Sequence, residues 1–134
     1  MIHSDGASNL HIGLGLLEKS GTIDFYPNGG RDQTNCAAVK DKIITGLINI
    51  VTLNIDELED ISGCSHVAAY KFFIDSIENP SCYTSYPCSS IEEFKLGNCI
   101  ECSKKGCNKM GYWADPSKDS GDLYLTTQVN SIFF

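Results

Sequence analysis

The sequence has few basic residues: 10 Lys and Arg stand against 17 Asp and Glu, and the formal net charge at pH 7 is −7. Binding to a phosphate backbone requires a basic face, and so does binding to an anionic membrane by charge alone. The charge balance therefore argues against both modes of binding, and we expect no nucleic-acid partner.

Long apolar runs are also missing. No stretch approaches the roughly 18 residues of a membrane-spanning helix, although 42% of the chain is hydrophobic. That fraction is ordinary for globular proteins, and 134 residues are enough for one small domain with its own core. No repeat, low-complexity tract or linker interrupts the chain, so we expect one compact unit without a transmembrane segment.

The N-terminus lacks the charged start, apolar stretch and small-residue cleavage site of a secretory signal. Yet the sequence contains 7 cysteines, a density typical of disulfide-bonded proteins in oxidising compartments. These two observations conflict in a complete secreted protein. The simplest resolution is that residues preceding Met1 are missing, and the alternatives are a reduced cytosolic protein or a zinc site.

The spacing of Cys99, Cys102 and Cys107 loosely resembles a zinc knuckle. A second C-x-x-C pair and a well-placed histidine are absent, however, and the short intervals from Cys88 to Cys99 and from Cys102 to Cys107 suit disulfide-closed loops equally well. We favour disulfides and expect neither a metal nor another cofactor, with zinc as the open alternative.

Two strands are expected from residue type. Residues 22–26 mix β-branched and aromatic side chains and end at Pro27-Asn28-Gly29-Gly30, which is a strong turn signal. Residues 123–127 form a second, short strand candidate. The stretch from Ser81 to Asp115 is predicted to be loop-like and is dense in cysteine.

Helical periodicity marks two segments. The stronger one covers residues 65–78, with Ser65 as a plausible N-cap and Pro80 as the stop. Its expected apolar stripe is Val67, Tyr70, Phe73, Ile74 and Ile77. The second segment lies between Cys36 and Cys64 and is amphipathic. Its apolar positions are Val39, Ile43, Ile44, Leu47, Ile48 and Val51.

His66 follows a cysteine and a cap-like serine at the expected start of the 65–78 helix. One interpretation is a general base, whose neutral form a helix N-terminus would favour and whose charged form would need a nearby carboxylate. The other is a cap-region histidine bonded to the backbone, and from this residue alone that interpretation is favoured.

No nucleophile can be assigned from the residues. His3, Ser4 and Asp5 include all three triad residue types, but neighbouring residues cannot converge as a triad. The G-x-S-x-G elbow of serine hydrolases is absent from the sequence. The residues alone thus indicate an acidic α/β unit with cysteine-closed loops, and its chemistry stays open.

Several stretches together resemble the pancreatic lipase group of animal lipases, which includes insect and venom phospholipases A1. The matching stretches, in family order, are residues 2–6 (IHSDG), 21–30 (GTIDFYPNGG), 64–70 (CSHVAAY), 75–77 (DSI), 86–88 (YPC), 97–99 (GNC) and 110–115 (MGYWAD). They cover nearly the whole chain. The resemblance implies the C-terminal portion of an α/β-hydrolase catalytic domain over residues 1–134.

In this resemblance His66 occupies the position of the triad histidine. The order of these triads along the chain is serine, acid, histidine, so the serine, the usual acid and the calcium-binding loop are expected upstream of the present sequence. The family often has Arg two positions after the histidine, where this chain has Ala68. Asp5 lies near the place of the acid in many other α/β-hydrolases, which makes it a candidate substitute carboxylate.

The resemblance also implies three disulfides, Cys36–Cys64, Cys88–Cys99 and Cys102–Cys107, with Cys82 left over. The span 36–64 is long, as in triacylglycerol lipases, and we interpret its amphipathic stretch as a lid that meets a lipid–water interface; a buried surface helix is the alternative. Residues 82–115 form the cysteine-rich C-terminal part. The lipid-binding β-sandwich of vertebrate relatives is not expected, as in arthropod-like members.

The expected function is a secreted lipase that hydrolyses carboxylic esters of triacylglycerol or phospholipid, with a lipid substrate or lipid–water interface as its partner. Without the serine, the chain alone is expected to be inactive. A non-catalytic lipid-binding or storage protein is the main alternative. A small cysteine-rich secreted binding module is a third, and the order of the matched stretches opposes it.

Overall fold

The computed structural model describes residues 1–6, 15–34, 36 and 55–127, and within the helical span 55–62 it describes the backbone only. Every element and contact reported below lies in these ranges. The lid positions Val39, Ile43, Ile44, Leu47, Ile48 and Val51 lie outside them.

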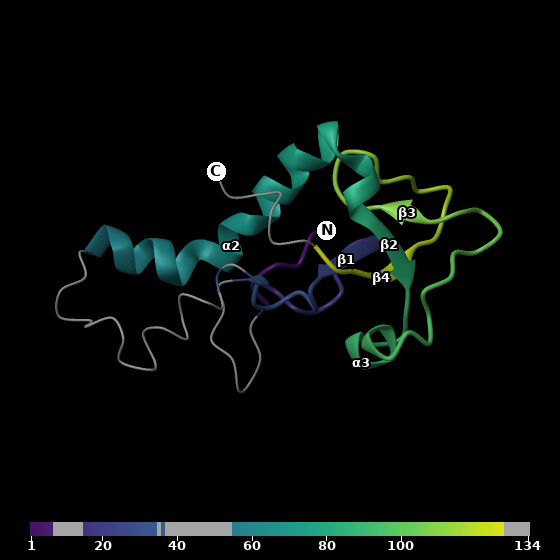
Figure 1. Ribbon diagram of the computed structural model, residues 1–134, viewed down its shortest axis with the longest axis horizontal. Helices are drawn as coiled ribbons and strands as arrows, with labels where there is room; N and C mark the ends of the chain where they lie inside the picture. The colour runs from purple at the N-terminus through teal and green to yellow at the C-terminus, as the bar shows by residue number, and fades with distance from the viewer. Residues whose placement is uncertain (7–14, 35, 37–54, 128–134) are drawn as a thin grey trace.

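A four-stranded mixed sheet forms the centre of the molecule, with strand order β1-β4-β2-β3 (Figure 1). The strands are β1 (Ile23–Pro27), β2 (Thr84–Pro87), β3 (Asn108–Lys109) and β4 (Gly121–Leu125). β1 and β4 are parallel, whereas β2 is antiparallel to both β4 and β3. Both strands expected from the sequence are therefore present, the second displaced by two residues toward the N-terminus.

The turn after β1 also has the expected geometry. Asn28, Gly29 and Gly30 all have positive φ, at 53°, 90° and 75°. A side chain at Gly30 would place its Cβ 2.7 Å from the ring of Tyr26, so glycine is required there for space as well as for backbone conformation.

Side chains on successive strand residues point to opposite faces of the sheet. The register between β1 and β4 pairs Phe25 with Leu123 on one face, and it pairs Asp24 with Asp122 and Tyr26 with Tyr124 on the other. We call the first the apolar face and the second the aromatic–acidic face. The two faces are covered by different elements and, as described below, by different kinds of contact.

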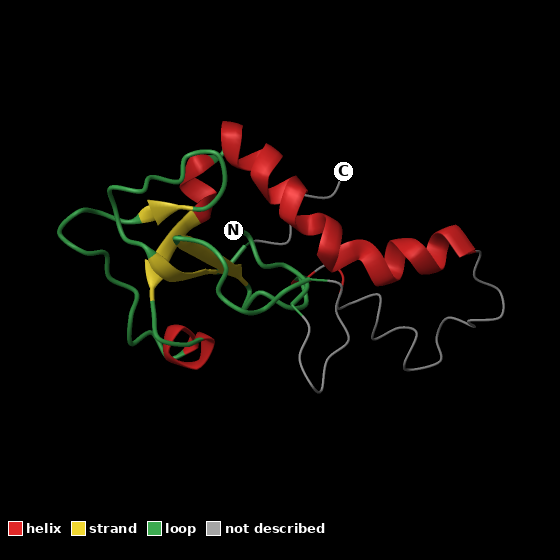
Figure 2. Cartoon of the chain, turned by 180° about the vertical axis from the view of Figure 1, so that it is seen from behind, coloured by secondary structure: helices red, strands yellow, loops and turns green. Residues whose placement is uncertain are grey.

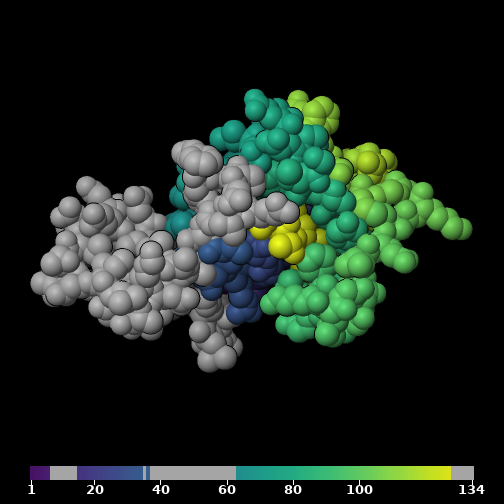
Figure 3. Space-filling view, in the orientation of Figure 1, coloured from purple at the N-terminus to yellow at the C-terminus, as the bar shows by residue number. Residues whose placement is uncertain are grey.

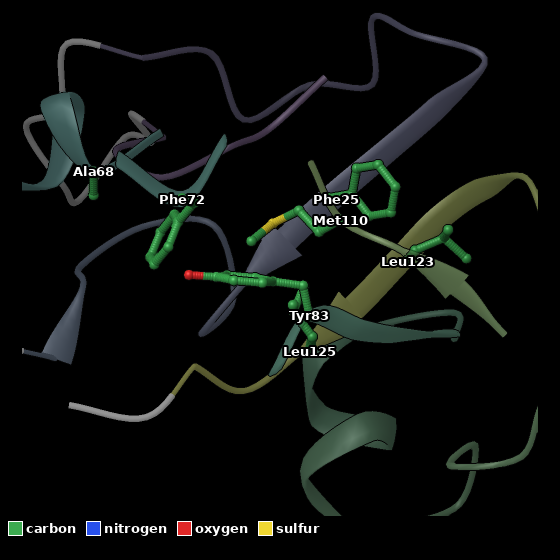
Figure 4. Packing of buried hydrophobic residues seen from close by; sticks show 7 residues of the cluster. All are labelled: Phe25, Ala68, Phe72, Tyr83, Met110, Leu123 and Leu125. Atoms are coloured by element: carbon green, nitrogen blue, oxygen red, sulfur yellow. The ribbon is translucent and has the colours of Figure 1, made fainter. Parts of the chain in front are cut away.

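The apolar face packs against helix α2, which runs from Ile55 to Glu78 (Figure 2). The buried cluster consists of Phe25, Ala68, Phe72, Tyr83, Met110, Leu123 and Leu125 (Figure 4). The Tyr83 hydroxyl donates to Asp75 Oδ2 at 2.6 Å. Burial and this hydrogen bond raise the pKa of Tyr83, so the ring stays neutral at the edge of the core.

The aromatic–acidic face carries a series of stacked rings. Tyr26 stacks on Tyr124 with centroids 5.2 Å apart, and Phe94 of the short helix α3 (Ile91–Lys95) stacks on Tyr124 at 6.3 Å and on Tyr86 at 6.2 Å. The sheet therefore lies between α2 and α3, with yellow residues near the end of β4 visible between the teal and green regions in Figure 3.

The start of the helix differs from the prediction. α2 begins at Ile55, so Ser65 lies inside the helix and is not its N-cap. The Ser65 side chain is buried, and its hydroxyl oxygen accepts from the backbone N–H of Gln33 at 3.2 Å. Ser65 therefore makes a tertiary contact with Gln33 and does not cap the helix. The helix does end at Glu78, and Pro80 opens a 3-10 turn over Pro80–Tyr83.

The predicted apolar stripe of this helix is not its buried face. Ala68, Phe72 and Ser76 are buried, whereas Tyr70, Phe73, Ile74 and Ile77 are exposed, Tyr70 to 56%. The predicted stripe therefore has the period of a helix but lies on the wrong side, because the side that packs onto the sheet combines one large apolar residue, Phe72, with the small residues Ala68 and Ser76. Tyr112 and Trp113 adjoin the exposed side, where the Trp113 indole N–H donates to the Ile77 carbonyl at 3.2 Å.

The structure contains the three disulfides that the resemblance implies: Cys36–Cys64, Cys88–Cys99 and Cys102–Cys107. Cys82 is a free, exposed thiol. The three cysteines considered for zinc are thus all in disulfides, and no group of His, Cys, Asp and Glu in the described ranges could hold a metal ion. The segment predicted as loop-like also contains β2, α3 and β3.

Of the helices in the described ranges, none combines the length and apolar character needed to cross a membrane.

Candidate functional site

His66 lies well inside α2 and is exposed. The helix begins at Ile55, which is about three turns earlier at 3.6 residues per turn. The field of a helix N-terminus is largely confined to the first turn. The prediction that a helix N-terminus acts on His66 is therefore wrong, and other groups must set its chemistry.

His66 borders a cavity of about 280 Å³. The cavity is lined by residues 1–5, by Gly15 and Leu16, and by His66 and Ala69 of α2. Among the described residues that line the cavity, Asp5 is the only one with a carboxylate, and it is 2% exposed. The structure thus brings the two residues predicted for the site, His66 and Asp5, to one cavity although they are far apart in the sequence.

Backbone hydrogen bonds hold the segment that carries Asp5. Ile2 forms a parallel bridge with Phe25 of β1, and the His3 N–H donates to the Phe25 carbonyl at 2.9 Å. The Gly15 N–H donates to the Asp5 carbonyl at 2.9 Å, and the Gly6 N–H donates to the Gly30 carbonyl at 2.8 Å. The backbone around Asp5 is therefore fixed on both sides.

A direct contact joins this segment to α2. The Ser4 hydroxyl donates to the backbone carbonyl of His66 at 3.4 Å. Gln33, which is buried, donates through its Nε2 to the Ser4 carbonyl at 2.9 Å, and its own N–H reaches Ser65. The helix at His66 and the segment at Asp5 are thus connected through Ser4 and Gln33.

A buried contact between a histidine and an aspartate lies beside the cavity. His3 Nε2 is 2.7 Å from Asp24 Oδ1, and both side chains are almost fully buried. Burial alone would raise the pKa of Asp24, but hydrogen bonds from His3 and from the N–H groups of Ser20 and Gly21 outweigh it, so the pKa is lowered. The carboxylate is therefore ionised at neutral pH.

Sequence reasoning missed this pair. In the sequence, His3 stands out only beside its neighbours Ser4 and Asp5, and Asp24 only as a member of the predicted strand. The available signal was an aspartate between Ile23 and Phe25 in an otherwise apolar strand. A carboxylate buried at such a position requires a donor, although the identity of that donor is set by tertiary structure.

Comparison with known proteins points to a single family, the lipases. The chain matches the family model described as Lipase over residues 1–133. It is 38% identical to pancreatic lipase-related protein 2 of Bos taurus over 135 aligned residues, which cover 100% of this chain and 27% of that protein.

Two human proteins are similarly related. The chain is 38% identical to pancreatic lipase-related protein 3 of Homo sapiens, with 86% of this chain and 24% of that protein covered. It is 35% identical to human pancreatic triacylglycerol lipase, with 99% and 29% covered. The chain spans about a quarter of the length of the curated relatives it matches. By the match of the family model over residues 1–133, the chain belongs to the lipase family.

Proposed function

We propose that this chain is the C-terminal portion of an α/β-hydrolase catalytic domain and supplies the histidine base of a secreted carboxylic ester hydrolase. Its substrate would be triacylglycerol or phospholipid. The nucleophilic serine would lie on polypeptide outside these 134 residues, since the sequence has no G-x-S-x-G elbow. The family match and the share of the relatives that the chain covers support this proposal.

The observation that carries the proposal is the position of His66, an exposed residue at the edge of a cavity that the buried Asp5 also lines. In serine-dependent ester hydrolysis the serine oxygen adds to the ester carbonyl while the histidine takes the hydroxyl proton. The histidine then delivers that proton to the departing alcohol, and water releases the fatty acid in a second round.

Asp5 is proposed as a substitute acid for His66. A triad acid holds the imidazole in orientation and stabilises its charged form without itself taking the proton. The burial of Asp5 and its fixed backbone suit this role. The usual acid of the family would lie outside the chain, so Asp5 would act either in its place or beside it.

The span 36–64 is proposed as a lid. The disulfide between Cys36 and Cys64 brings the two ends of this span together, with Cα atoms 5.7 Å apart, and attaches them to α2 just before His66. An amphipathic segment held in this way could cover the site in water and open at a lipid surface. The three disulfides are consistent with an oxidising, extracellular environment.

The test uses the complete gene product that contains this chain. Hydrolysis of emulsified triolein and of phosphatidylcholine vesicles is measured for the parent protein, for His66→Ala and for Asp5→Asn. Loss of a triad histidine should lower kcat by about 10³-fold or more with substrate binding retained. The matched control is Ser76→Ala, a buried position on the same helix away from the cavity.

Full turnover by His66→Ala would exclude the proposed base, and unchanged kcat in Asp5→Asn would exclude only the substitute acid. Labelling by a lipid-like phosphonate, which requires a reactive serine, separates the enzyme from its alternative. A complete protein that binds emulsions, hydrolyses nothing and is not labelled would be a non-catalytic lipid-binding or storage protein.

A further inference from the structure

His3 lines the same cavity as His66, yet its ring is bonded at both nitrogens. Nε2 lies 2.7 Å from Asp24 Oδ1, and Nδ1 lies 2.7 Å from the backbone carbonyl of Leu16. Both partners are acceptors, because a carbonyl has no proton and the Asp24 carboxylate is held ionised by further donors. Each ring nitrogen of His3 therefore faces an acceptor, and only a ring with an N–H at both positions donates to both partners.

This arrangement excludes His3 as a proton acceptor for substrate, since neither nitrogen has a free lone pair. It suits a fixed cation instead. Its partner Asp24 also accepts from the N–H groups of Ser20 and Gly21 at 3.2 and 3.1 Å. The ring stacks on Tyr26 with centroids 4.5 Å apart and planes 6° apart, a geometry in which a cation is attracted to an aromatic face.

The contacts of His3 join three parts of the chain. Through Leu16 it holds the loop 15–21, through Asp24 and Tyr26 it holds β1, and its own backbone belongs to the segment that carries Asp5. The next residue, Ser4, donates to the His66 carbonyl. The segment on which His3 is fixed is therefore the one that contacts α2 at the proposed base.

We propose that His3, held between Asp24 and the Leu16 carbonyl, is a positioning residue that fixes residues 3–5 against α2 at His66. This inference rests on the proposed function, because the geometry it maintains is that of the His66 site. His3 itself touches neither substrate nor the reacting atoms. It keeps Asp5, and the contact of Ser4 with the His66 carbonyl, in a fixed position relative to α2.

The first test measures the protonation of His3 directly. In the complete protein labelled with ¹⁵N-histidine and assigned through backbone connectivities, nitrogen shifts and attached protons are recorded at neutral pH. We expect protons on both ring nitrogens of His3, protected from exchange by burial. A neutral ring with one bare nitrogen would overturn the inference, and this measurement needs no variant that could fail to fold.

The second test is kinetic. His3→Phe keeps a flat ring over Tyr26 but removes both N–H donors, so kcat on triolein should fall on the order of 10- to 100-fold, the effect of a small misplacement of catalytic groups. KM should change by less than about twofold, because no substrate contact is removed. His3→Gln, which can restore one donor, should recover part of the lost kcat.

The matched control is Asp122→Asn. Asp122 is the register partner of Asp24 on β4 but makes its ion pair with Lys19, at 3.7 Å. The kcat of the Asp122→Asn protein should stay within about twofold of the kcat of the parent protein. A His3→Phe protein with parent kcat, beside an inactive His66→Ala protein, would overturn the positioning role alone. An active His66→Ala protein would overturn the proposed function itself.

Discussion

The two faces of the sheet are buried in different ways. On the apolar face, Phe25 and Leu123 pack against α2 in a cluster of buried hydrophobic side chains. On the aromatic–acidic face, Asp24 and Tyr26 contact the buried His3 ring, and Tyr26 also belongs to a row of stacked rings. Non-directional packing supplies stability on the first face, whereas directional hydrogen bonds fix the position of one segment on the second.

The cavity lies beside the directional contacts of the aromatic–acidic face. His3, which borders the cavity, belongs to the aromatic–acidic face, and the residues beside it hold the segment at α2. A site that needs defined distances is thus supported by groups whose geometry is restricted. The apolar face could tolerate substitutions of similar volume, but the ion pair could not.

The largest expected effect is on the apolar face. Phe72→Ala removes a ring that is 1% exposed and in contact with Tyr83, and it should lower the free energy of unfolding by about 3–5 kcal/mol. The neighbouring Phe73 is 45% exposed, so Phe73→Ala is the matched control and should cost less than about 1 kcal/mol. Urea denaturation of the two variants measures both values, and equal losses would contradict the assignment of faces.

The next effect is the acid dependence of the buried pair. The folded pKa of Asp24 is lowered, so its contribution to stability is present above the unfolded value near 3.9 and is lost as pH falls through the folded pKa. The difference in unfolding free energy between the parent and Asp24→Asn should be constant between about pH 5 and pH 6 and shrink below about pH 4. A difference that stays constant down to pH 2 would show that Asp24 is not paired in solution.

A smaller effect is expected from the stacked rings. Tyr124→Leu keeps apolar volume over the sheet but removes the stacking with Tyr26 and Phe94. Aromatic pairs contribute about 0.5–1.5 kcal/mol beyond their buried area, so the loss should be about 1 kcal/mol. Thermal denaturation followed by near-UV circular dichroism measures this loss, and a cost as large as that of Phe72→Ala would place Tyr124 in the core.

The smallest effect should come from the surface. Lys19 and Asp122 approach to 3.7 Å, with the lysine side chain 55% exposed. Exposed ion pairs contribute little, so Lys19→Ala should change the free energy of unfolding by less than about 0.5 kcal/mol. A loss above 1 kcal/mol, measured by urea denaturation at low salt, would mean that the aromatic–acidic face depends on charge beyond the buried pair.

Local features of the fold were predictable where local chemistry determines them. The β-branched and aromatic run before Pro27 and the glycines after Asn28 specify a strand and a turn, and both are present. The helix through Phe72 was visible from its period. The buried side of this helix could not be predicted, because Ser65 and Ser76 are interior positions only through partners elsewhere in the chain. Ser65 accepts from Gln33, and Ser76 accepts from Tyr112.

For the site, family resemblance pointed to His66, and position along the chain alone suggested Asp5; in the structure both residues line one cavity. The His3–Asp24 pair could not be predicted, because the two residues are 21 positions apart and no periodic pattern links them. A buried charge requires a partner, but only the folded chain determines which residue that partner is.

Trp113 is the single tryptophan of the chain, is half-exposed, and is bonded by its indole N–H to the last turns of α2. Its fluorescence is therefore an intrinsic reporter of that end of the helix. Separation of Trp113 from Ile77 would shift the emission toward the red and increase quenching by iodide. Titration with detergent or lipid can thus be followed at one wavelength without adding a dye.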